Sequence, residues 1–233
     1  MKAVVMNGFG GPEVLNYQDV DTPEIGPEDV LVEVHAVSIN RTFDLFLREN
    51  TYAYTPDLPH IMGVDPSGVI TAVGENVTDR KVGDRVFCSI FVPTTRPDPY
   101  MSLPGLGPVD FLGVTVWGGN AQYVRTMASR TVPVPDNLNF HEATVIGRHL
   151  ATAVNQVDNV LKAKEGDTVL VMGATGGLGA ACIQVAKWAG ARVIAAAGAD
   201  DRVAATLELG ADHGINYRSH DLTEEILKLT DGQ

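Results

Sequence analysis

The sequence predicts an α/β protein in which a β-rich domain, residues 1–135, is followed over residues 136–233 by the first half of a doubly wound parallel sheet. Three observations indicate this fold. Short β-branched runs separated by Gly, Pro and Asp turns fill the first part. Helical patterns dominate after Phe140. Between Thr168 and Gly198 an apolar run, a glycine-rich turn, a helix and a second apolar run follow one another, which is the order of a βαβ unit.

The first domain takes its elements from short apolar runs that are bounded by turn residues. We expect a short helix at 42–48 and strands at 1–7, 15–20, 30–37, 68–73, 85–90 and 121–127. Residues 93–108 contain five prolines, which predicts an irregular loop that is long for a compact domain. Residues 132–139 read VPVPDNLN and are expected to form a linker.

The second domain is expected to open with a helix that runs from residue 140 to about residue 161. The uniformly apolar run that follows predicts a strand buried on both faces. Three strands in the order 3-2-1 cover only one side of the first strand, so its far edge is expected to be bare and the chain to end inside a domain. The expected elements are strands 169–172, 192–197 and 214–217 and helices 180–189, 200–209 and 222–229.

A glycine-rich turn, 173–179, follows the first of these strands directly. Glycine permits a tight turn and a close approach of the backbone to a pyrophosphate, and the next helix offers free N–H groups and the positive end of its dipole. The turn therefore predicts a dinucleotide site, and the alternative is a glycine turn that binds nothing. The cofactor-binding residues expected at the two strand ends are Ala174, Thr175, Gly176, Gly177, Leu178 and Gly198.

Composition limits the possible partners and the compartment. The formal net charge of −12 argues against a general nucleic-acid or anionic-membrane surface, so we expect neither partner. Cys88 and Cys182 are the only cysteines and make no disulfide framework, which favours a cytoplasmic location. The N-terminus lacks the apolar core of a signal peptide, and no stretch is predicted to span a bilayer.

Two further motifs accompany the glycine turn: Val-Gly-Asp-Arg-Val at 82–86 and Gly-Gly-x-Ala-x-Tyr-Val at 118–124. With the β-rich first domain, they resemble the medium-chain dehydrogenase/reductase superfamily over nearly the whole chain. The resemblance implies a GroES-like catalytic domain at 1–135, a partial Rossmann domain that binds NADPH at 136–233, and catalysis in the cleft between them. It also implies a homodimer for a full-length chain.

The resemblance also bears on metals. At or near the three positions where zinc-dependent members carry ligands, this sequence has Asn40, Val64 and Arg148. The lobe at 93–115 contains no cysteine, whereas structural zinc takes four ligands. We therefore expect no metal. Three other candidates lack ligand spacing and are expected to be surface or satisfied polar residues: His60, Cys88 and His149.

Segments 40–44 and 215–218 resemble those of the quinone oxidoreductase and enoyl reductase branch, which uses NADPH. The residues at the end of the second strand agree with that cofactor. That strand ends at Gly198 without the acid that NAD sites usually carry. Arg202 stands where NADPH-using relatives have Lys or Arg, and Tyr217 matches a tyrosine near their 2′-phosphate. The alternatives are a solvated helix charge for Arg202 and a packed strand tyrosine for Tyr217.

Without a metal, the resemblance favours hydride transfer from NADPH to a quinone, an enone or an enoyl thioester. Asn40 is expected to donate a hydrogen bond to the developing oxyanion, and Tyr52 or Tyr54 to supply a further donor or the proton. Thr152 matches a threonine near the nicotinamide, and Arg41 is expected at the pyrophosphate or the substrate. The alternatives are a turn role for Asn40, loop packing for the tyrosines and an ordinary salt bridge for Arg41.

Two other functions stay open from the sequence: a zinc-type alcohol dehydrogenase, and a non-catalytic relative that binds a nucleotide.

Overall fold

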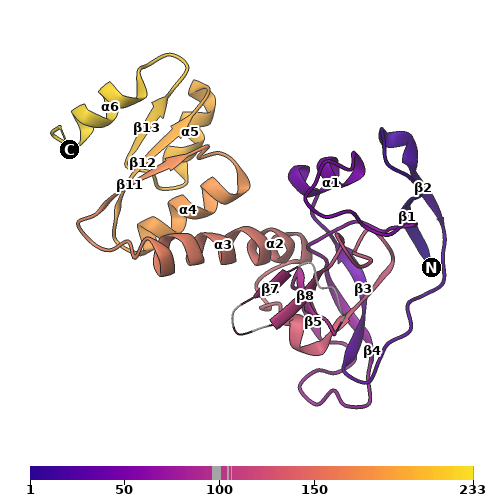
Figure 1. Ribbon diagram of the computed structural model, residues 1–233. Helices are drawn as coiled ribbons and strands as arrows, with labels where there is room; N and C mark the ends of the chain where they lie inside the picture. The colour runs from indigo at the N-terminus through magenta and orange to yellow at the C-terminus, as the bar shows by residue number, and fades with distance from the viewer. Residues whose placement is uncertain (96–100, 104, 106, 233) are drawn as a thin grey trace. The chain divides into compact units, whose positions relative to one another are not determined.

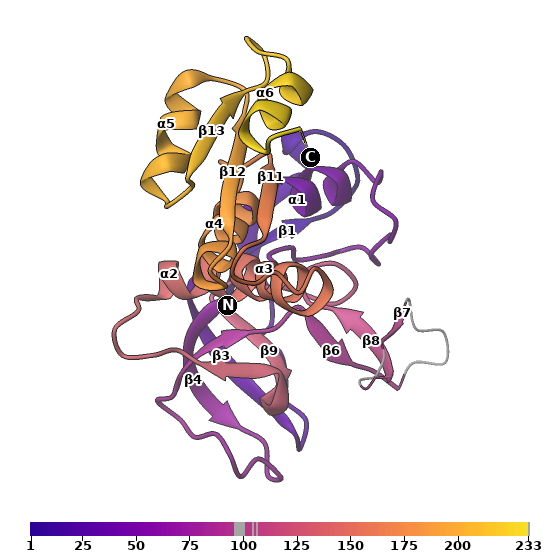
Figure 2. The ribbon, with the colours of Figure 1, turned by 90° about the vertical axis from the view of Figure 1, so that its left-hand side faces the viewer.

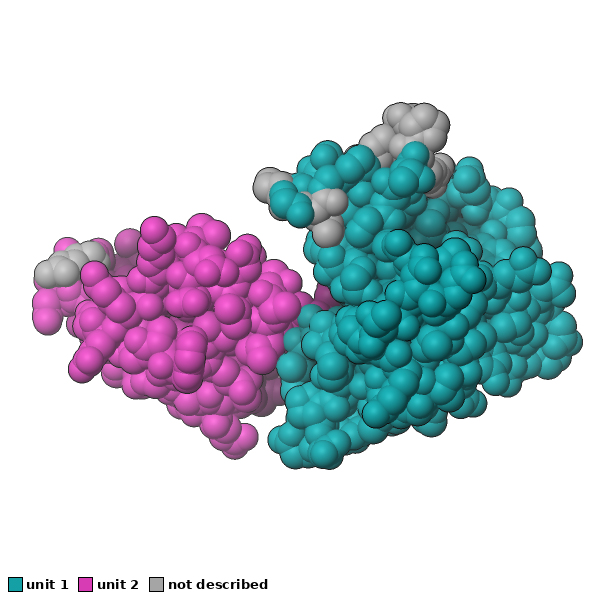
Figure 3. Space-filling model, turned by 90° about the horizontal axis from the view of Figure 1, so that it is seen from below, with its two compact units in different colours: residues 1–147 teal, residues 148–233 magenta. Residues whose placement is uncertain are grey.

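The chain divides into two compact units in the computed structural model, which describes residues 1–95, 101–103, 105 and 107–232 (Figure 1). Unit 1 spans Met1–Gly147 and unit 2 spans Arg148–Gln233 (Figure 3). The sequence instead predicts a domain boundary at 135/136. Helix α2 (Phe140–Val145) lies between the two positions and packs on strands of unit 1. That the second domain begins at residue 136 stays a prediction.

Unit 1 is built on a five-stranded antiparallel sheet with the strand order β10-β5-β4-β3-β9. Its strands are β3 (Asp29–Ala36), β4 (Ser67–Val73), β5 (Arg85–Cys88), β9 (Tyr123–Met127) and β10 (Thr131–Pro133). Alternate side chains of β3 point to one face, and Val30 and Val32 are buried there against Ile70 and Val86. Four of the five strands were predicted, with ends that differ by one or two residues.

Three shorter elements of unit 1 also match the prediction. β1 (Lys2–Met6) and β2 (Leu15–Asp19) form an antiparallel pair, separated by a 3-10 turn at Pro12–Val14. Helix α1 (Arg41–Arg48) begins one residue before its predicted start. A second 3-10 turn, Ala128–Arg130, joins β9 to β10.

A three-stranded antiparallel sheet occupies the proline-rich lobe, in the order β6-β8-β7. Its strands are β6 (Phe91–Pro93), β7 (Met101–Leu103) and β8 (Gly107–Phe111). The prediction that 93–108 is irregular is therefore wrong for the described part, and Pro97, Pro99 and Pro104 lie outside it. Proline removes only one donor, and its carbonyl still pairs: Thr94 N donates to the Pro108 oxygen at 3.0 Å.

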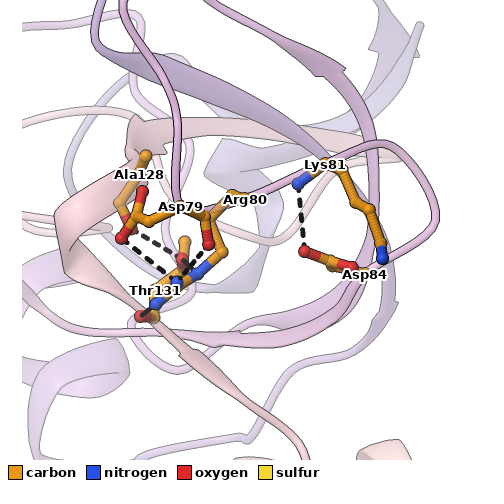
Figure 4. Close-up of polar contacts among 6 residues, drawn as sticks. All are labelled: Asp79, Arg80, Lys81, Asp84, Ala128 and Thr131. Atoms are coloured by element: carbon orange, nitrogen blue, oxygen red, sulfur yellow. Dashed lines mark hydrogen bonds and ion pairs between the residues drawn. The ribbon is translucent and has the colours of Figure 1, made fainter.

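Strand β10 occupies the start of the predicted linker, which is a second correction. Figure 4 shows the contacts that fix it. Arg80 Nε donates to Thr131 Oγ1 at 2.9 Å and Arg80 Nη2 donates to the Thr131 carbonyl at 2.8 Å. Thr131 Oγ1 donates in turn to the Ala128 carbonyl at 2.7 Å. The nearby turn is closed by Lys81 N, which donates to Asp84 Oδ2 at 3.0 Å.

The helix predicted from residue 140 is present but irregular. After α2 come a π-helical turn (Ile146–Leu150), the short α3 (Ala151–Val154) and a second π-helical turn (Asn155–Val160). The start is well defined because Asn139 Oδ1 accepts from Glu142 N at 2.9 Å while Glu142 Oε2 accepts from Asn139 N at 2.8 Å, a capping box. Wide π turns of this kind occur frequently at functional sites.

Unit 2 is a parallel sheet in the order β11-β12-β13, which confirms the predicted 3-2-1 arrangement. The strands are β11 (Thr168–Met172), β12 (Arg192–Ala197) and β13 (His213–Asn216), joined by α4 (Gly177–Trp188) and α5 (Asp200–Glu208) and followed by α6 (Leu222–Leu229). Figures 1 and 2 place β13 between α5 and α6. The core is formed where Val169, Val171 and Val193 meet Ile183 of α4.

Two details of unit 2 differ from the prediction. Helix α4 begins at Gly177, so the last glycines of the turn belong to its first helical turn. Strand β11 is buried on one face only, because Leu170 is 39% and Met172 is 52% exposed while Val169 and Val171 are buried. In the described part of unit 2, β11 pairs with β12 alone, so its outer edge is bare as predicted.

Candidate functional site

The glycine turn of unit 2 exposes the backbone N–H groups at the start of α4. Gly173 has a φ of +60°, and its carbonyl accepts from Gly176 N at 2.9 Å. Ala174 N donates to the Ala196 carbonyl at 3.1 Å and so anchors the turn to β12. Gly176 caps the helix without a side-chain hydrogen bond, and Thr175, Gly176 and Gly177 are exposed. Exposed first-turn N–H groups at the positive end of the helix dipole suit an anion such as a pyrophosphate.

The glycines of the turn differ in what a side chain would meet. A Cβ on Gly179 would lie 2.5 Å from the carbonyl oxygen of Gly173, so α4 can pack on the turn only if this residue is glycine. A Cβ on Gly176 would meet only that oxygen, at the less severe distance of 3.3 Å. A Cβ on Gly177 would lie 2.7 Å from Nε2 of His149. A groove of about 500 Å³ runs from these glycines along β11.

Sequence reasoning missed His149. It predicts a surface or satisfied polar residue, and the structure contradicts that: the side chain is half-buried, and Nδ1 is buried with no hydrogen-bond partner in the described part of the chain. The residue lies in the π-helical turn Ile146–Leu150, 28 positions before the glycine that it contacts. No local pattern signals a contact over that separation, so only the fold reveals it.

The end of β12 brings two predicted cofactor residues together. Measured from the position of a Cβ on Gly198, the Tyr217 hydroxyl is at 2.9 Å and Arg218 Nε at 3.3 Å. Tyr217 is 42% exposed, and Arg202 in the first turn of α5 is also exposed. Sequence reasoning did not assign Arg218 to the site, although its place beside Tyr217 was a usable signal. One phenol and one guanidinium at a glycine suit a phosphate.

One of the two acids near this end, Asp200, is held in a hydrogen bond. Asn216 Nδ2 donates to Asp200 Oδ1 at 2.6 Å, which joins the end of β13 to the first turn of α5. Asp201 is exposed in the same turn. The Asn216–Asp200 hydrogen bond fixes the loop that carries Gly198. The side-chain donors that remain for a phosphate are those of Arg202, Tyr217 and Arg218.

Thr152 lies on α3 in unit 2 with its hydroxyl in a local hydrogen bond. Its Oγ1 donates to the Arg148 carbonyl at 3.0 Å, one helical turn back, and the side chain is exposed. This bond uses the hydroxyl proton and leaves the oxygen as an acceptor. The predicted place of Thr152 near a nicotinamide stays a prediction.

In unit 1, Asn40 is the N-cap of α1. Its Oδ1 accepts from Phe43 N at 3.5 Å, which is the turn role that the sequence left as the alternative. The bond uses the side-chain oxygen, so the amide N–H groups stay available as donors. Arg41 is the exposed first residue of the same helix.

The two candidate tyrosines belong to an aromatic cluster. Ring centroids are 5.2 Å apart for Phe43 and Tyr52, 5.9 Å for Tyr52 and Tyr54, and 5.2 Å for Tyr54 and Phe111. Both tyrosines are half-buried against the core of unit 1. Packing, the alternative named for them, is therefore observed, and the cluster connects them to the helix that Asn40 caps.

A half-buried carboxyl group, that of Asp44, lies one helical turn after Asn40 and was not singled out from the sequence. Burial raises the pKa of Asp44 to about 6; a backbone hydrogen bond from Asn40 opposes this rise, and the nearby charge of Asp65 adds to it. Asp44 Oδ2 has no hydrogen-bond partner within the described residues. The side chain lines a cavity of about 790 Å³ in unit 1, together with Ile39, Arg48 and others.

The described residues hold neither a metal-binding cluster nor a membrane-spanning helix. Over residues 1–95, 101–103, 105 and 107–232, no three His, Cys, Asp or Glu side chains come close enough together to hold a metal ion. Within the part of the chain that is described, no helix has the length and apolar character needed to cross a membrane.

Comparison with known proteins agrees with this architecture. Residues 26–136 match the alcohol dehydrogenase GroES-like domain family, and residues 177–233 match the zinc-binding dehydrogenase family. An alcohol dehydrogenase of Geobacillus stearothermophilus is 34% identical over 236 residues, which cover 100% of this chain and 68% of that protein. The chain belongs to the medium-chain dehydrogenase/reductase superfamily. A quinone oxidoreductase of Rattus norvegicus is 33% identical over 227 residues, or 97% of this chain and 61% of the relative.

Solved structures of the superfamily superpose on this chain. An NAD-dependent alcohol dehydrogenase has a TM-score of 0.91 at 39% identity, with 100% of this chain and 68% of the other covered. The Escherichia coli quinone oxidoreductase complexed with NADPH has a TM-score of 0.82 at 25% identity, with 100% and 63% covered. These likenesses confirm the predicted fold, a GroES-like domain and the start of a Rossmann-type sheet. The chain spans about 61% of the length of the rat relative.

Proposed function

We propose that this oxidoreductase transfers a hydride from NADPH, without a metal ion, to a quinone or an activated carbon–carbon double bond. The observation that supports it most is the uncapped, exposed N-terminus of α4, with the Tyr217 and Arg218 pair at the end of β12. The first suits a pyrophosphate and the second suits a 2′-phosphate. Quinone oxidoreductases among the relatives support the substrate class.

The residues present fit the cofactor at each end. Gly176 leaves open the space that a Cβ would fill, as close approach of a phosphate requires. Thr175, Gly177 and Leu178 would hold the pyrophosphate through backbone N–H groups. Ala174 and Gly176, whose N–H groups bond to Ala196 and Gly173, would shape the turn around it. Gly198, Arg202, Tyr217 and Arg218 would hold the adenosine phosphate. Arg41 and Thr152 keep their predicted roles at the pyrophosphate or substrate and at the nicotinamide.

Bound NADPH would supply the hydride at its nicotinamide ring. For an enone or enoyl thioester, the hydride adds to the β-carbon, and the carbonyl oxygen becomes an enolate that needs a hydrogen-bond donor. The Asn40 amide is the proposed donor, and the Tyr52 or Tyr54 hydroxyl is the proposed source of the proton that completes the reduction. A quinone accepts the same hydride and proton to become a hydroquinone.

The absence of a zinc requirement is part of the proposal. Asn40 and Val64 stand at two of the ligand positions of zinc-dependent relatives, and Arg148 stands near the third. A hydrocarbon side chain cannot bind a metal, and a guanidinium repels one. Metal analysis of the purified protein tests this point, and about one equivalent of zinc per chain would contradict it.

Fluorescence titration of the chain with NADPH and NADH in parallel tests the cofactor. A charge-assisted hydrogen bond contributes about 1.5–3 kcal/mol, so we expect NADPH to bind about ten- to a hundredfold more tightly. Replacing Arg202 or Arg218 by Ala should narrow that ratio and leave NADH binding unchanged. Equal binding of both cofactors by the unmodified chain would contradict the choice of NADPH.

Steady-state rates with quinones, enones and enoyl thioesters test the chemistry. Asn40→Ala should lower kcat by about a hundredfold, the cost of one oxyanion donor. Asn40→Asp is the matched variant: it keeps an N-cap for α1 but replaces the donor by an acceptor. Loss of activity in Asn40→Ala alone, with Asn40→Asp fully active, would indicate that only the cap matters.

An NAD-dependent alcohol dehydrogenase is the second candidate, and the 39% identity to a structure of that description favours it. It predicts tighter binding of NADH and turnover of alcohols. A nucleotide-binding relative without catalysis would bind NADPH and turn over none of the three substrate classes.

A cytoplasmic location, consistent with the free cysteines Cys88 and Cys182, and a homodimer for a full-length protein complete the proposal.

A further inference from the structure

His149 lies against the backbone of the glycine turn. Its Nε2, Cε1 and Cδ2 atoms are 2.7, 2.9 and 3.0 Å from the position of a Cβ on Gly177, so the face of the imidazole at Nε2 lies over that position. A Cβ on Gly176 would instead meet only the Gly173 carbonyl oxygen, at 3.3 Å. The two adjacent glycines therefore serve different ends: one leaves room for a ligand and the other admits a histidine.

The two ring nitrogens of His149 have different surroundings. Nδ1 is buried and has no hydrogen-bond partner in the described part of the chain, whereas Nε2 is the ring atom nearest to the exposed Gly177. An unpaired acceptor is tolerated in protein interiors somewhat better than an unpaired N–H group. With the proton on Nε2, the buried Nδ1 is left as an unpaired acceptor and Nε2 is a hydrogen-bond donor beside the start of α4.

No hydrogen bond within the described residues uses this donor. A polar ring held by packing beside a helix N-terminus gains most from an anion, because the backbone N–H groups and the helix dipole act on the same ligand. An anion bound at the start of α4 would lie beside Gly177 and the histidine that packs on it.

We propose that His149 binds the pyrophosphate of the dinucleotide through Nε2–H. The proposal rests on the proposed function, since it needs a dinucleotide at the glycine turn. The histidine adds one side-chain donor to a site that otherwise holds the pyrophosphate through backbone N–H groups. It thereby fixes the pyrophosphate with respect to α4.

The test measures two ligands on the whole chain: NADPH, and adenosine 2′-monophosphate, which has no pyrophosphate. In His149→Leu the Kd for NADPH should rise about tenfold, the fold-change for one lost hydrogen bond to a charged group. His149→Gln, whose amide retains a donor, should recover part of that loss. Neither substitution should change the Kd for adenosine 2′-monophosphate. His220→Leu, at an exposed histidine of unit 2, is the matched control and should change neither Kd.

Thermal unfolding separates binding from structure. Leucine removes an unpaired buried nitrogen, so His149→Leu should unfold at the same or a higher temperature. An unchanged Kd for NADPH in His149→Leu, or a loss of affinity for both ligands together with a lower Tm, would overturn the inference and leave the proposed function standing. Failure of the unmodified chain to bind NADPH or NADH would overturn both.

Discussion

His60 lies in the core of unit 1, where it is 1% exposed and its Nε2 has no hydrogen-bond partner among the described residues. Burial lowers the pKa of His60 from 6.5 to about 4, although a backbone hydrogen bond with Gly113 and the charge of Asp57 act in the opposite direction. The folded protein therefore resists the proton that the unfolded chain accepts near pH 6.5.

We predict that His60 makes the free energy of unfolding fall in acid. Its contribution is fully present above pH 6.5 and is lost as the pH falls to 4, by about 3 kcal/mol at most. His60→Gln should destabilise the protein at pH 7.5, where packing is lost, and much less at pH 4.5. Urea unfolding in a Trp188→Phe background, which leaves Trp117 as a reporter in unit 1, measures the difference. A difference that is constant with pH would contradict this origin.

Asp44 is expected to change the free energy of unfolding with pH in the opposite sense to His60. Burial raises the pKa of Asp44 from 3.8 to about 6, so its contribution is fully present below pH 3.8 and is lost as the pH rises through 6. Asp44→Asn should therefore stabilise unit 1 at pH 7.5 relative to the unmodified chain, and the gain should shrink towards pH 4. The same Trp117 reporter measures it. A gain of the same size at both pH values would show that titration of Asp44 is not the cause.

At the scale of elements, the glycine turn can be separated into a packing position and a ligand position. Gly179→Ala places a Cβ 2.5 Å from the Gly173 carbonyl, so we predict a loss of about 1–3 kcal/mol in the stability of unit 2. Gly176→Ala, whose Cβ would meet only the Gly173 carbonyl oxygen at 3.3 Å, should destabilise unit 2 less than Gly179→Ala and should weaken NADPH binding. Urea unfolding in a Trp117→Phe background, with Trp188 on α4 as reporter, and cofactor titration give the two readouts. Equal stabilities of the two variants would contradict the assignment.

The elements also show how far the sequence predicts this structure. The βαβ unit was predicted with ends within about three residues, because its strands, glycine turn and helices are set by local patterns. Strand β10 was missed because its contacts are distant in sequence: Arg80 and Thr131 are 51 positions apart. The lobe strands pair locally, with Leu103 opposite Gly107, and were missed because the prolines of 93–108 indicate irregular structure. The face of β11 was mispredicted because an apolar run does not reveal which of its sides is covered.

The candidate site is likewise predicted in part: residues in local motifs are found, and residues defined by distant contacts are not. The turn residues 174–178, Gly198 and Tyr217 are found from motifs, and the structure brings Gly198 and Tyr217 together. His149 and Asp44 were missed because each is set apart by one buried side-chain atom without a hydrogen-bond partner, which no residue pattern encodes. The roles assigned to Asn40, Tyr52, Tyr54 and Arg202 stay predictions.

At the scale of the whole molecule, net charge and exposed apolar surface have opposite effects on the association of one copy of the chain with another. The charge of −12 at pH 7 keeps copies of the chain apart, and salt screens that repulsion. The open edge of β11 favours association, because it offers unpaired backbone groups beside Leu170, 39% exposed, and Met172, 52% exposed. The extent of association should therefore depend on ionic strength and on the pH relative to the pI of about 4.8.

We predict that the 233-residue chain associates increasingly as salt is raised or the pH approaches 4.8, and that Leu170→Lys suppresses this association. A lysine at the edge brings a charge that a second strand would have to bury or face. Val82→Lys is the matched control, because Val82 is 59% exposed in a turn away from any sheet edge and the change in net charge is the same. Light scattering at several salt concentrations compares the two variants. Equal suppression by both would assign the association to net charge, whereas suppression by Leu170→Lys alone assigns it to the edge of β11.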